Sequence, residues 1–181
     1  MTKAERQIHR LQATAYHEAG HAVVGYHNDL KFRYVTIKPS GDALGHVLSP
    51  ASPKSFNPEF MTRTSYHAIV YWQRRLVTSF AGQFAEGKFL GKHPRHGHDS
   101  DDQQAVNVAI ELTGSQKQLQ KYLDFSLVVA EETVNIFWPD IKAVATALIE
   151  RETLSFKEVR DVIRATVPKF VPPIVSRGGM S

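Results

Sequence analysis

The sequence predicts a mainly α (α+β) fold, in which several long helices surround a small β-hairpin. Long segments carry apolar residues at the three- and four-residue spacing of a buried helix face, and three of them open with capping-box residues. Two short segments instead read as strands on either side of a turn. The 181 residues, 42% of them hydrophobic, suit one globular domain, which we expect over residues 1–167, with a loose Pro- and Gly-rich tail over 168–181.

The first predicted element is a helix from about residue 3 to residue 28. Thr2 and Glu5 have the spacing of a capping box at its start. His17 and His21 point away from the apolar stripe of this helix. The residues of that stripe recur at helical spacing: Ile8, Leu11, Ala15, Ala19, Ala22, Val23 and Tyr26.

The hairpin is predicted next, because residues 33–39 and 44–50 flank the turn sequence SGDA. A proline-rich loop follows. Ser100 and Ser155 stand where helix caps are expected, each with Gln or Glu three positions later. The remaining helices are predicted at about 62–90, 100–112, 115–137, 139–151 and 155–166.

Composition and charge exclude several classes of protein. The net charge of +4 comes from Lys and Arg scattered along the chain, so no nucleic-acid surface is indicated. The absence of cysteine excludes disulfides, Cys-ligated zinc and a thiol nucleophile. No secretory signal and no membrane span is recognisable, and we therefore expect a soluble, cytoplasmic protein.

The segment TAYHEAGHAVVGYH contains the pattern His17-Glu18-x-x-His21. Residues four apart on a helix lie on one face about one turn apart, so both imidazoles can bind one ion at ~2.0–2.1 Å each. Glu18 lies beside them, where it can take a proton from a water molecule that zinc acidifies and pass it to a leaving amine. The pattern predicts a zinc site with Glu18 as the catalytic acid and base.

A catalytic zinc ion usually has three protein ligands, and the sequence offers four candidates for the third. Asp102 is preferred, because it shares a helix face with inward residues at 105, 106 and 109 and would point inward from the first helical turn. Asp101 satisfies a similar argument. Glu86, on the helix predicted at 62–90, is either a ligand or a supporting carboxylate.

The fourth candidate is His27, six positions after His21. That distance suits some zinc proteases, but Val24 stands where they need glycine to turn the chain. On a continuous helix His27 lies about 120° away from His21. Other histidines are not assigned to the site: His46 in the hairpin, and His93, His96 and His98 in a loop.

At these residues the chain resembles the zinc peptidase domain of the FtsH-type ATP-dependent metalloproteases. The similar segments are TAYHEAGHAVVGY, VTIKPSGDALGHVL, SFAGQFAEGKFLG, SDDQQAV and ALIERETLSFKEVRDVI. The resemblance implies a zincin-like fold, zinc bound by His17, His21 and Asp102, and Glu18 as the catalytic residue. It also implies that the strand YVTIKP is a sheet edge that holds an extended polypeptide. The family's ATPase module and membrane anchor are not recognisable here.

The functional expectation is a zinc metalloendopeptidase that cleaves flexible or unfolded polypeptides. The chain could form an oligomer, and a separate ATPase or delivery partner could bring it substrates. Two alternatives use the same residues. The chain could be a peptidase-like binding or regulatory module with little turnover. It could also be a zinc amidohydrolase acting on a small substrate in a closed pocket.

Overall fold

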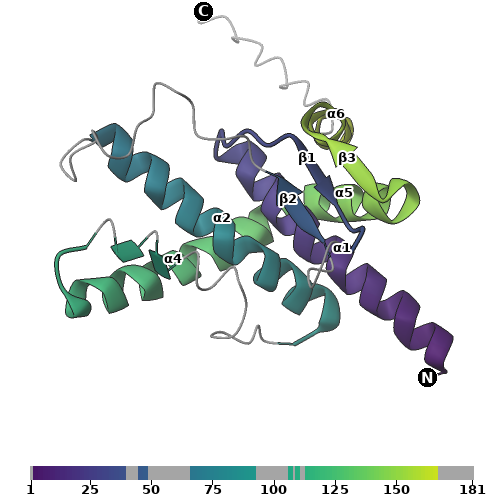
Figure 1. Cartoon of the computed structure of the whole chain (residues 1–181), viewed down its shortest axis with the longest axis horizontal. Helices are drawn as coiled ribbons and strands as arrows, with labels where there is room; N and C mark the ends of the chain where they lie inside the picture. The colour runs from purple at the N-terminus through teal and green to yellow at the C-terminus, as the bar shows by residue number, and fades with distance from the viewer. Residues whose placement is uncertain are drawn as a thin grey trace, which may run out of the picture.

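The computed structural model describes residues 2–39, 45–48, 66–92, 106–107, 109–110 and 113–166. Helices dominate and a small three-stranded sheet accompanies them, so the mainly α prediction is confirmed (Figure 1). Within the described part of the chain, no helix combines the length and the apolar character needed to cross a membrane. The elements are α1 (Lys3–His27), β1 (Tyr34–Thr36), β2 (His46–Leu48), α2 (Tyr66–Leu90), α4 (Gln116–Ile136), α5 (Trp138–Arg151), β3 (Thr153–Ser155) and α6 (Phe156–Thr166).

Helix α1 begins at the predicted cap. The backbone N–H of Thr2 donates to Oε2 of Glu5 at 2.7 Å, and the N–H of Glu5 donates to Oγ1 of Thr2 at 3.2 Å. Its first turns project from the body of the molecule (Figure 1), leaving Ile8 59% and Leu11 42% exposed. These two residues of the predicted stripe are therefore not in the core. One face of the later turns lies in the core, as the fully buried Ala15, Ala19 and Ala22 show.

Helices α1 and α2 cross at very close range. A Cβ atom at Gly20 would lie 2.6 Å from the carbonyl oxygen of Ala81 and 2.8 Å from Cβ of Ala85. Real Cβ atoms do not approach backbone oxygens so closely, so glycine is required at this crossing. Small residues on both helices thus bring the histidine-bearing α1 against α2.

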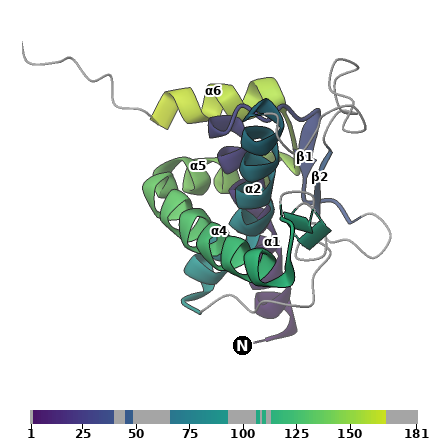
Figure 2. The ribbon, with the colours of Figure 1, turned by 90° about the vertical axis from the view of Figure 1, so that its left-hand side faces the viewer.

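The other helices cover the far side of this pair. Figure 2 shows the sheet on one side of α1 and α2, with α4 and α5 on the other. Helix α5 packs on α1, and α4 packs on α2. The fully buried side chains at the centre come from every layer, including Val23, Leu76, Val134, Ile141 and Leu148.

The sheet has the order β2-β1-β3, and both pairs are antiparallel. Tyr34 faces Leu48 and Thr36 faces His46, which confirms the predicted hairpin. The expectation that the strand YVTIKP forms the edge of the sheet is wrong, because β1 lies in the middle. Within the described residues, β2 is an outer strand.

Strand β3 was not predicted because three residues between two helices carry no periodic signal. Glu152 ends α5 in the left-handed conformation, with φ of 61°, and so reverses the chain. Its carbonyl oxygen accepts from the backbone N–H of Ile37 at 2.9 Å. Leu154, fully buried, then faces the equally buried Val35. Strand β3 therefore pairs with β1 because the turn at the end of α5 brings it there.

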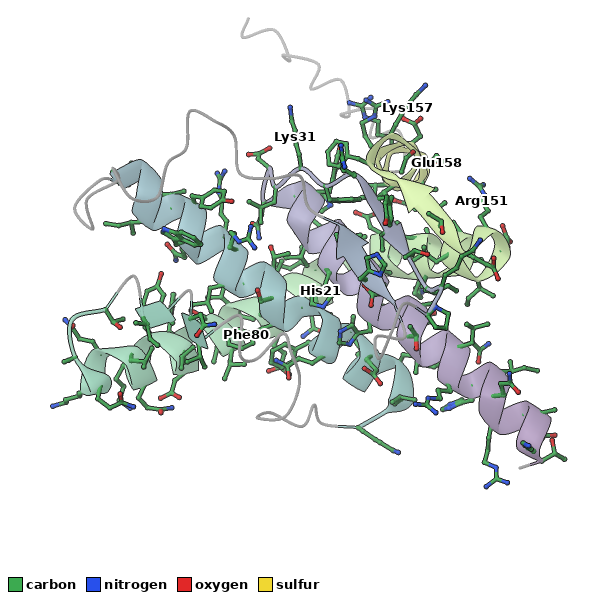
Figure 3. The ribbon with its side chains drawn as sticks, in the orientation of Figure 1. His21, Lys31, Phe80, Arg151, Lys157 and Glu158 are labelled. Carbon is green, nitrogen blue, oxygen red and sulfur yellow. The ribbon has the colours of Figure 1, made fainter. Side chains whose placement is uncertain are left out.

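The predicted cap of the last helix is confirmed. The backbone N–H of Ser155 donates to Oε2 of Glu158 at 2.8 Å, and the N–H of Glu158 donates to Oγ of Ser155 at 3.3 Å. Figure 3 shows Glu158 at this end of α6. The beginning of the helix predicted at 62–90, the histidines at 93, 96 and 98, the aspartates at 101 and 102 and the tail over 168–181 lie outside the described residues.

Candidate metal centre

His17 and His21 lie on one face of α1, as their spacing predicts, and both rings face α2. Their Nε2 atoms are 3.1 Å apart. The side chain of His17 is 17% exposed, so the pair is largely shielded from bulk water. Figure 3 shows His21 where α1 and α2 cross.

The other nitrogen of each ring has an acceptor on α2. Nδ1 of His21 lies 2.8 Å from the carbonyl oxygen of Thr78, and Nδ1 of His17 lies 3.0 Å from Oε2 of Glu86. A carbonyl oxygen only accepts, so we infer that Nδ1 of His21 carries the hydrogen, and the carboxylate implies the same for His17. In the neutral rings, each Nε2 atom then holds a lone pair, and both lone pairs face the same space.

This donor set fits a metal ion. Two lone pairs 3.1 Å apart repel each other unless a cation or a shared proton lies between them. Two ligands of a tetrahedral zinc ion with bonds of ~2.0–2.1 Å are about 3.3 Å apart, close to the separation observed. A carboxylate or carbonyl on the outer nitrogen is the usual arrangement for a metal-binding histidine, because it fixes the tautomer and the orientation of the ring.

Gly82 of α2 faces the two Nε2 atoms. A Cβ atom at this position would lie 2.3 Å from Nε2 of His21 and 2.8 Å from Nε2 of His17. Any other residue would therefore fill the space in front of the imidazoles. Glycine inside a helix costs roughly 1 kcal/mol relative to alanine, and here it keeps the ligand face open.

Glu18 is buried, with 5% of its surface exposed. Its carboxylate lies against the start of β2, because a Cβ atom at Gly45 would be 2.8 Å from Oε1 of Glu18. The same Cβ atom would be 2.8 Å from the carbonyl oxygen of Thr36 on β1. Glu18, next to His17 in sequence, thus has its carboxylate at the start of β2, an outer strand of the described sheet.

The structure describes two of the four candidates for a third ligand. Asp101 and Asp102 lie outside the described residues. Glu86 reaches the outer nitrogen of His17, which is the position of a supporting carboxylate. His27 is engaged elsewhere, with Nε2 3.0 Å from Oδ2 of Asp140 and its ring stacked on a phenylalanine at 137. Among the described residues, no three His, Cys, Asp or Glu side chains are grouped to hold one ion.

Sequence reasoning missed three contributors to the site. Gly82 had a usable signal, because a glycine inside a strongly helical segment indicates close approach of another group. Gly45 stood inside the second predicted strand, over 44–50, and was not singled out. Thr78 contributes its backbone carbonyl, which no side-chain pattern can reveal. His46, which was left unassigned, lies in β2 with its ring against that of Tyr34.

Comparison with known proteins indicates the family to which this chain belongs. Three proteins named ATP-dependent zinc metalloprotease FtsH are similar to this chain. The one from Caulobacter vibrioides is 26% identical over 86% of this chain and 30% of its own length. The one from Mycoplasma pneumoniae is 31% identical over 83% of this chain and 21% of its own length. The one from Acidobacterium capsulatum is 26% identical over 99% of this chain and 32% of its own length.

The chain thus spans about a third or less of the length of these relatives. The model of peptidase family M41 matches residues 4–115, which is more than half of the 181 residues and includes both histidines and Glu18. The resemblance to the FtsH-type peptidase domain is confirmed at the level of the family. With its paired imidazoles and buried glutamate, the chain belongs to peptidase family M41.

Proposed function

We propose that this chain is a zinc metallopeptidase domain in which His17, His21 and Asp102 bind the metal and Glu18 is the general base. One observation carries the proposal. The two Nε2 atoms face each other at 3.1 Å while both Nδ1 atoms are held by acceptors on α2, with the buried Glu18 alongside.

A bound zinc ion would polarise the peptide carbonyl and acidify water at the site. Glu18 takes the proton from that water and returns it to the departing amine. The contact with the backbone at Gly45 restricts where its carboxylate can move, so the base is held in place before substrate binds. The acceptors at Thr78 and Glu86 keep both imidazoles in the tautomer that leaves Nε2 unprotonated.

Asp102 remains a proposal from the sequence. Residues 106–107 and 109–110 are helical, and Ala109 is fully buried, in keeping with the face that was predicted to point inward. If the helix extends back to Asp102, the spacing of four and seven residues would put Asp102, Val106 and Ala109 on one side of it. A carboxylate from this face would complete a set of two imidazoles and one carboxylate.

We further propose that substrates are flexible or unfolded polypeptides. Strand β2, which begins beside Glu18, is an outer strand of the described sheet, so its edge away from β1 could align an extended chain by main-chain hydrogen bonds. The names of the relatives describe ATP-dependent proteases. An ATPase, as a further module or a separate partner, would then deliver such substrates. We place the whole site in one domain over residues 1–167.

The first test measures metal content and cleavage together. Wild-type protein should hold close to one zinc ion per chain and cleave an unfolded casein substrate. Glu18→Gln should keep the zinc and lose cleavage by about 10²- to 10⁴-fold. Undiminished cleavage by this variant would refute the role of Glu18. Zinc binding by wild type without turnover of any unfolded substrate would favour a binding module instead.

The second test concerns the third ligand. Asp102→Ala should lower the zinc content of the purified protein, whereas the neighbouring variant Asp101→Ala should keep it near that of wild type. Loss of zinc in Asp101→Ala alone would identify Asp101 as the ligand and leave the remainder of the proposal intact. Equal retention by both variants would exclude both aspartates.

A further inference from the structure

The two faces of strand β2 differ in what their side chains meet. A Cβ atom at Gly45 would lie 2.8 Å from Oε1 of Glu18, so position 45 faces α1. Val47 also packs against the core, and its partner on β1, Val35, is fully buried. Successive side chains of a strand point to opposite faces. His46 therefore stands one residue from the proposed base, on the face of the sheet that is turned away from α1.

This outward face carries polar side chains, and Figure 2 shows β1 and β2 at the outer side of the helices. Thr36, which faces His46 across the strand pair, is buried, and its hydroxyl lies 2.7 Å from that of Thr153. Tyr34 and His46 are only half-buried. Their polar atoms are thus the ones on this face that a ligand can reach.

His46 and Tyr34 form a hydrogen-bonded aromatic pair. Nε2 of His46 lies 3.4 Å from the hydroxyl of Tyr34, and the ring centroids are 5.7 Å apart at an angle of 65°. In the part of the chain that the structure describes, the imidazole has no further hydrogen bond. A hydroxyl can donate as well as accept, and when it donates to Nε2, the hydrogen of the neutral ring is on Nδ1. The pair then offers a donor to an acceptor from outside.

We propose that His46 selects substrates that carry a carboxylate side chain in the residue that docks beside it. This inference rests on the proposed function, in which an extended polypeptide pairs with the edge of β2 away from β1. In such a pairing, the Cβ atom of the residue opposite His46 is about 4.5–5.5 Å from the Cβ atom of His46, on the same face. A Glu or Asp side chain at this distance can accept from Nδ1–H, whereas a Lys side chain brings only donors.

The selected substrate residue is close to the bond that is cleaved. Gly45 lies at the carboxylate of Glu18, which acts at the scissile carbonyl, and His46 is the next residue. One residue of strand spans about 3.3 Å, so the substrate residue beside His46 is within about two positions of the scissile bond. Its immediate neighbours in the substrate face the opposite way, toward α1. The selection by His46 thus concerns a single substrate position.

Cleavage of matched peptides tests this selection. One internally quenched sequence carries Glu, Gln or Lys in turn at each of the two positions on either side of the scissile bond. At one of these positions, zinc-loaded wild type should cleave the Glu peptide with about tenfold higher kcat/KM than the Lys peptide, with Gln between them. Mass spectrometry of the products checks that the same bond is cut. Equal kcat/KM for the Glu and Lys peptides at all four positions would overturn the inference.

Variants of the pair show whether His46 is responsible. His46→Ala should make the Glu and Lys peptides equivalent within about twofold, and His46→Glu should reverse the preference, because a carboxylate attracts Lys and repels Glu. Tyr34→Phe keeps the ring, loses the hydroxyl and should reduce the preference about two- to threefold. Lys142→Gln, at an exposed position on α5, removes one positive charge and should keep the wild-type preference. If His46 only maintained the strand, its variants would slow all peptides equally, and the unchanged preference would refute the inference.

A binding measurement separates a failure of this inference from a failure of the proposed function. Wild type that binds zinc but cleaves none of the peptides would refute the proposed peptidase activity. The selection is still measured by fluorescence anisotropy, as the Kd of the same peptides for the Glu18→Gln variant. The Glu peptide should bind about tenfold more tightly than the Lys peptide, and adding His46→Ala should abolish the difference. Equal Kd values for the two peptides in Glu18→Gln would refute selection by His46.

Discussion

The carboxylate of Glu86 lies 3.0 Å from Nδ1 of His17, although 69 positions separate the two residues in the sequence. Helices α1 and α2 bring them together through the glycine and alanine contacts at their crossing. The carboxylate therefore orients the ring of His17 through its outer nitrogen. Sequence reasoning treated Glu86 as either a ligand or a supporting carboxylate, and the structure places it at the outer nitrogen of a proposed ligand.

Removing this support should weaken the metal site. Glu86→Ala should lower zinc affinity by about 10- to 100-fold, because the ring of His17 loses the acceptor that fixes its tautomer. Glu86→Gln keeps an acceptor oxygen and should lower the zinc affinity less than Glu86→Ala does. Competition with a chromogenic chelator measures both affinities. Glu150→Ala, an exposed glutamate on α5, is the matched control. Unchanged affinity in Glu86→Ala would contradict the supporting role.

Gly82→Ala should abolish zinc binding while leaving the helices intact. The new Cβ atom would start 2.3 Å from Nε2 of His21, so one or both rings must turn away. Gly25→Ala is the control within α1, because its Cβ atom would make an ordinary contact of 3.5 Å with Thr78. Zinc titration monitored by calorimetry compares the two. Stoichiometric zinc in Gly82→Ala would show that the ligand face tolerates a methyl group.

Gly20→Ala and Gly25→Ala should change stability in opposite directions. At Gly20 the Cβ atom would lie 2.6 Å from the backbone oxygen of Ala81, so α1 and α2 must separate at a cost of about 1–3 kcal/mol. At Gly25 the added methyl has room, and alanine should raise stability by about 0.5–1 kcal/mol. Urea unfolding followed by circular dichroism measures both. A neutral Gly20→Ala variant would mean that the crossing is looser than described.

His27→Gln should lower stability without affecting the metal. The ring stacks on Phe137 with 3.6 Å between centroids and contacts Asp140, so it ties the end of α1 to the start of α5. Losing a partly buried contact of this kind should cost about 1–3 kcal/mol. Thermal unfolding measures the loss, and zinc analysis of the folded variant should match wild type. Loss of zinc from folded protein would instead restore His27 as a candidate ligand.

The cap of α6 predicts a pH dependence. The hydrogen bond from the Ser155 hydroxyl, and then that from its backbone N–H, lowers the pKa of Glu158 below its ordinary value. A carboxyl whose pKa is lower in the folded state stabilises the fold fully above the unfolded pKa of about 4.3, and this contribution is lost as the pH falls through the folded value. Glu158→Gln should therefore be less stable than wild type at pH 7, with a smaller difference at pH 3. A difference in thermal midpoint that is constant with pH would contradict this.

Local patterns were enough to predict the framework of the site. Thr2 and Ser155 could be identified as caps because capping depends on residues three apart. His17 and His21 could be paired because helical geometry fixes their common face. These predictions needed no knowledge of distant residues, and the structure agrees with them in each position.

The remaining features depend on contacts between segments that are far apart in the sequence. The acceptor on His21 is the backbone carbonyl of Thr78, and every residue has a carbonyl. Residues 153–155 form strand β3 because they hydrogen-bond to β1, and a pattern of three residues cannot predict such a pairing. The exposure of Ile8 and Leu11 depends on where neighbouring helices stop, which the apolar stripe of α1 does not encode.

The placement of β3 beside β1 also bears on how this protein can be shortened. The family match ends at residue 115, yet Leu154 completes the sheet and α5 covers α1 from beyond that limit. A fragment cut where the family match ends would lack β3, which pairs with β1, and α5, which packs on α1, and would expose the core residues that these elements cover. The family match and the folding unit thus have different limits, and an expression fragment should be chosen by the folding unit.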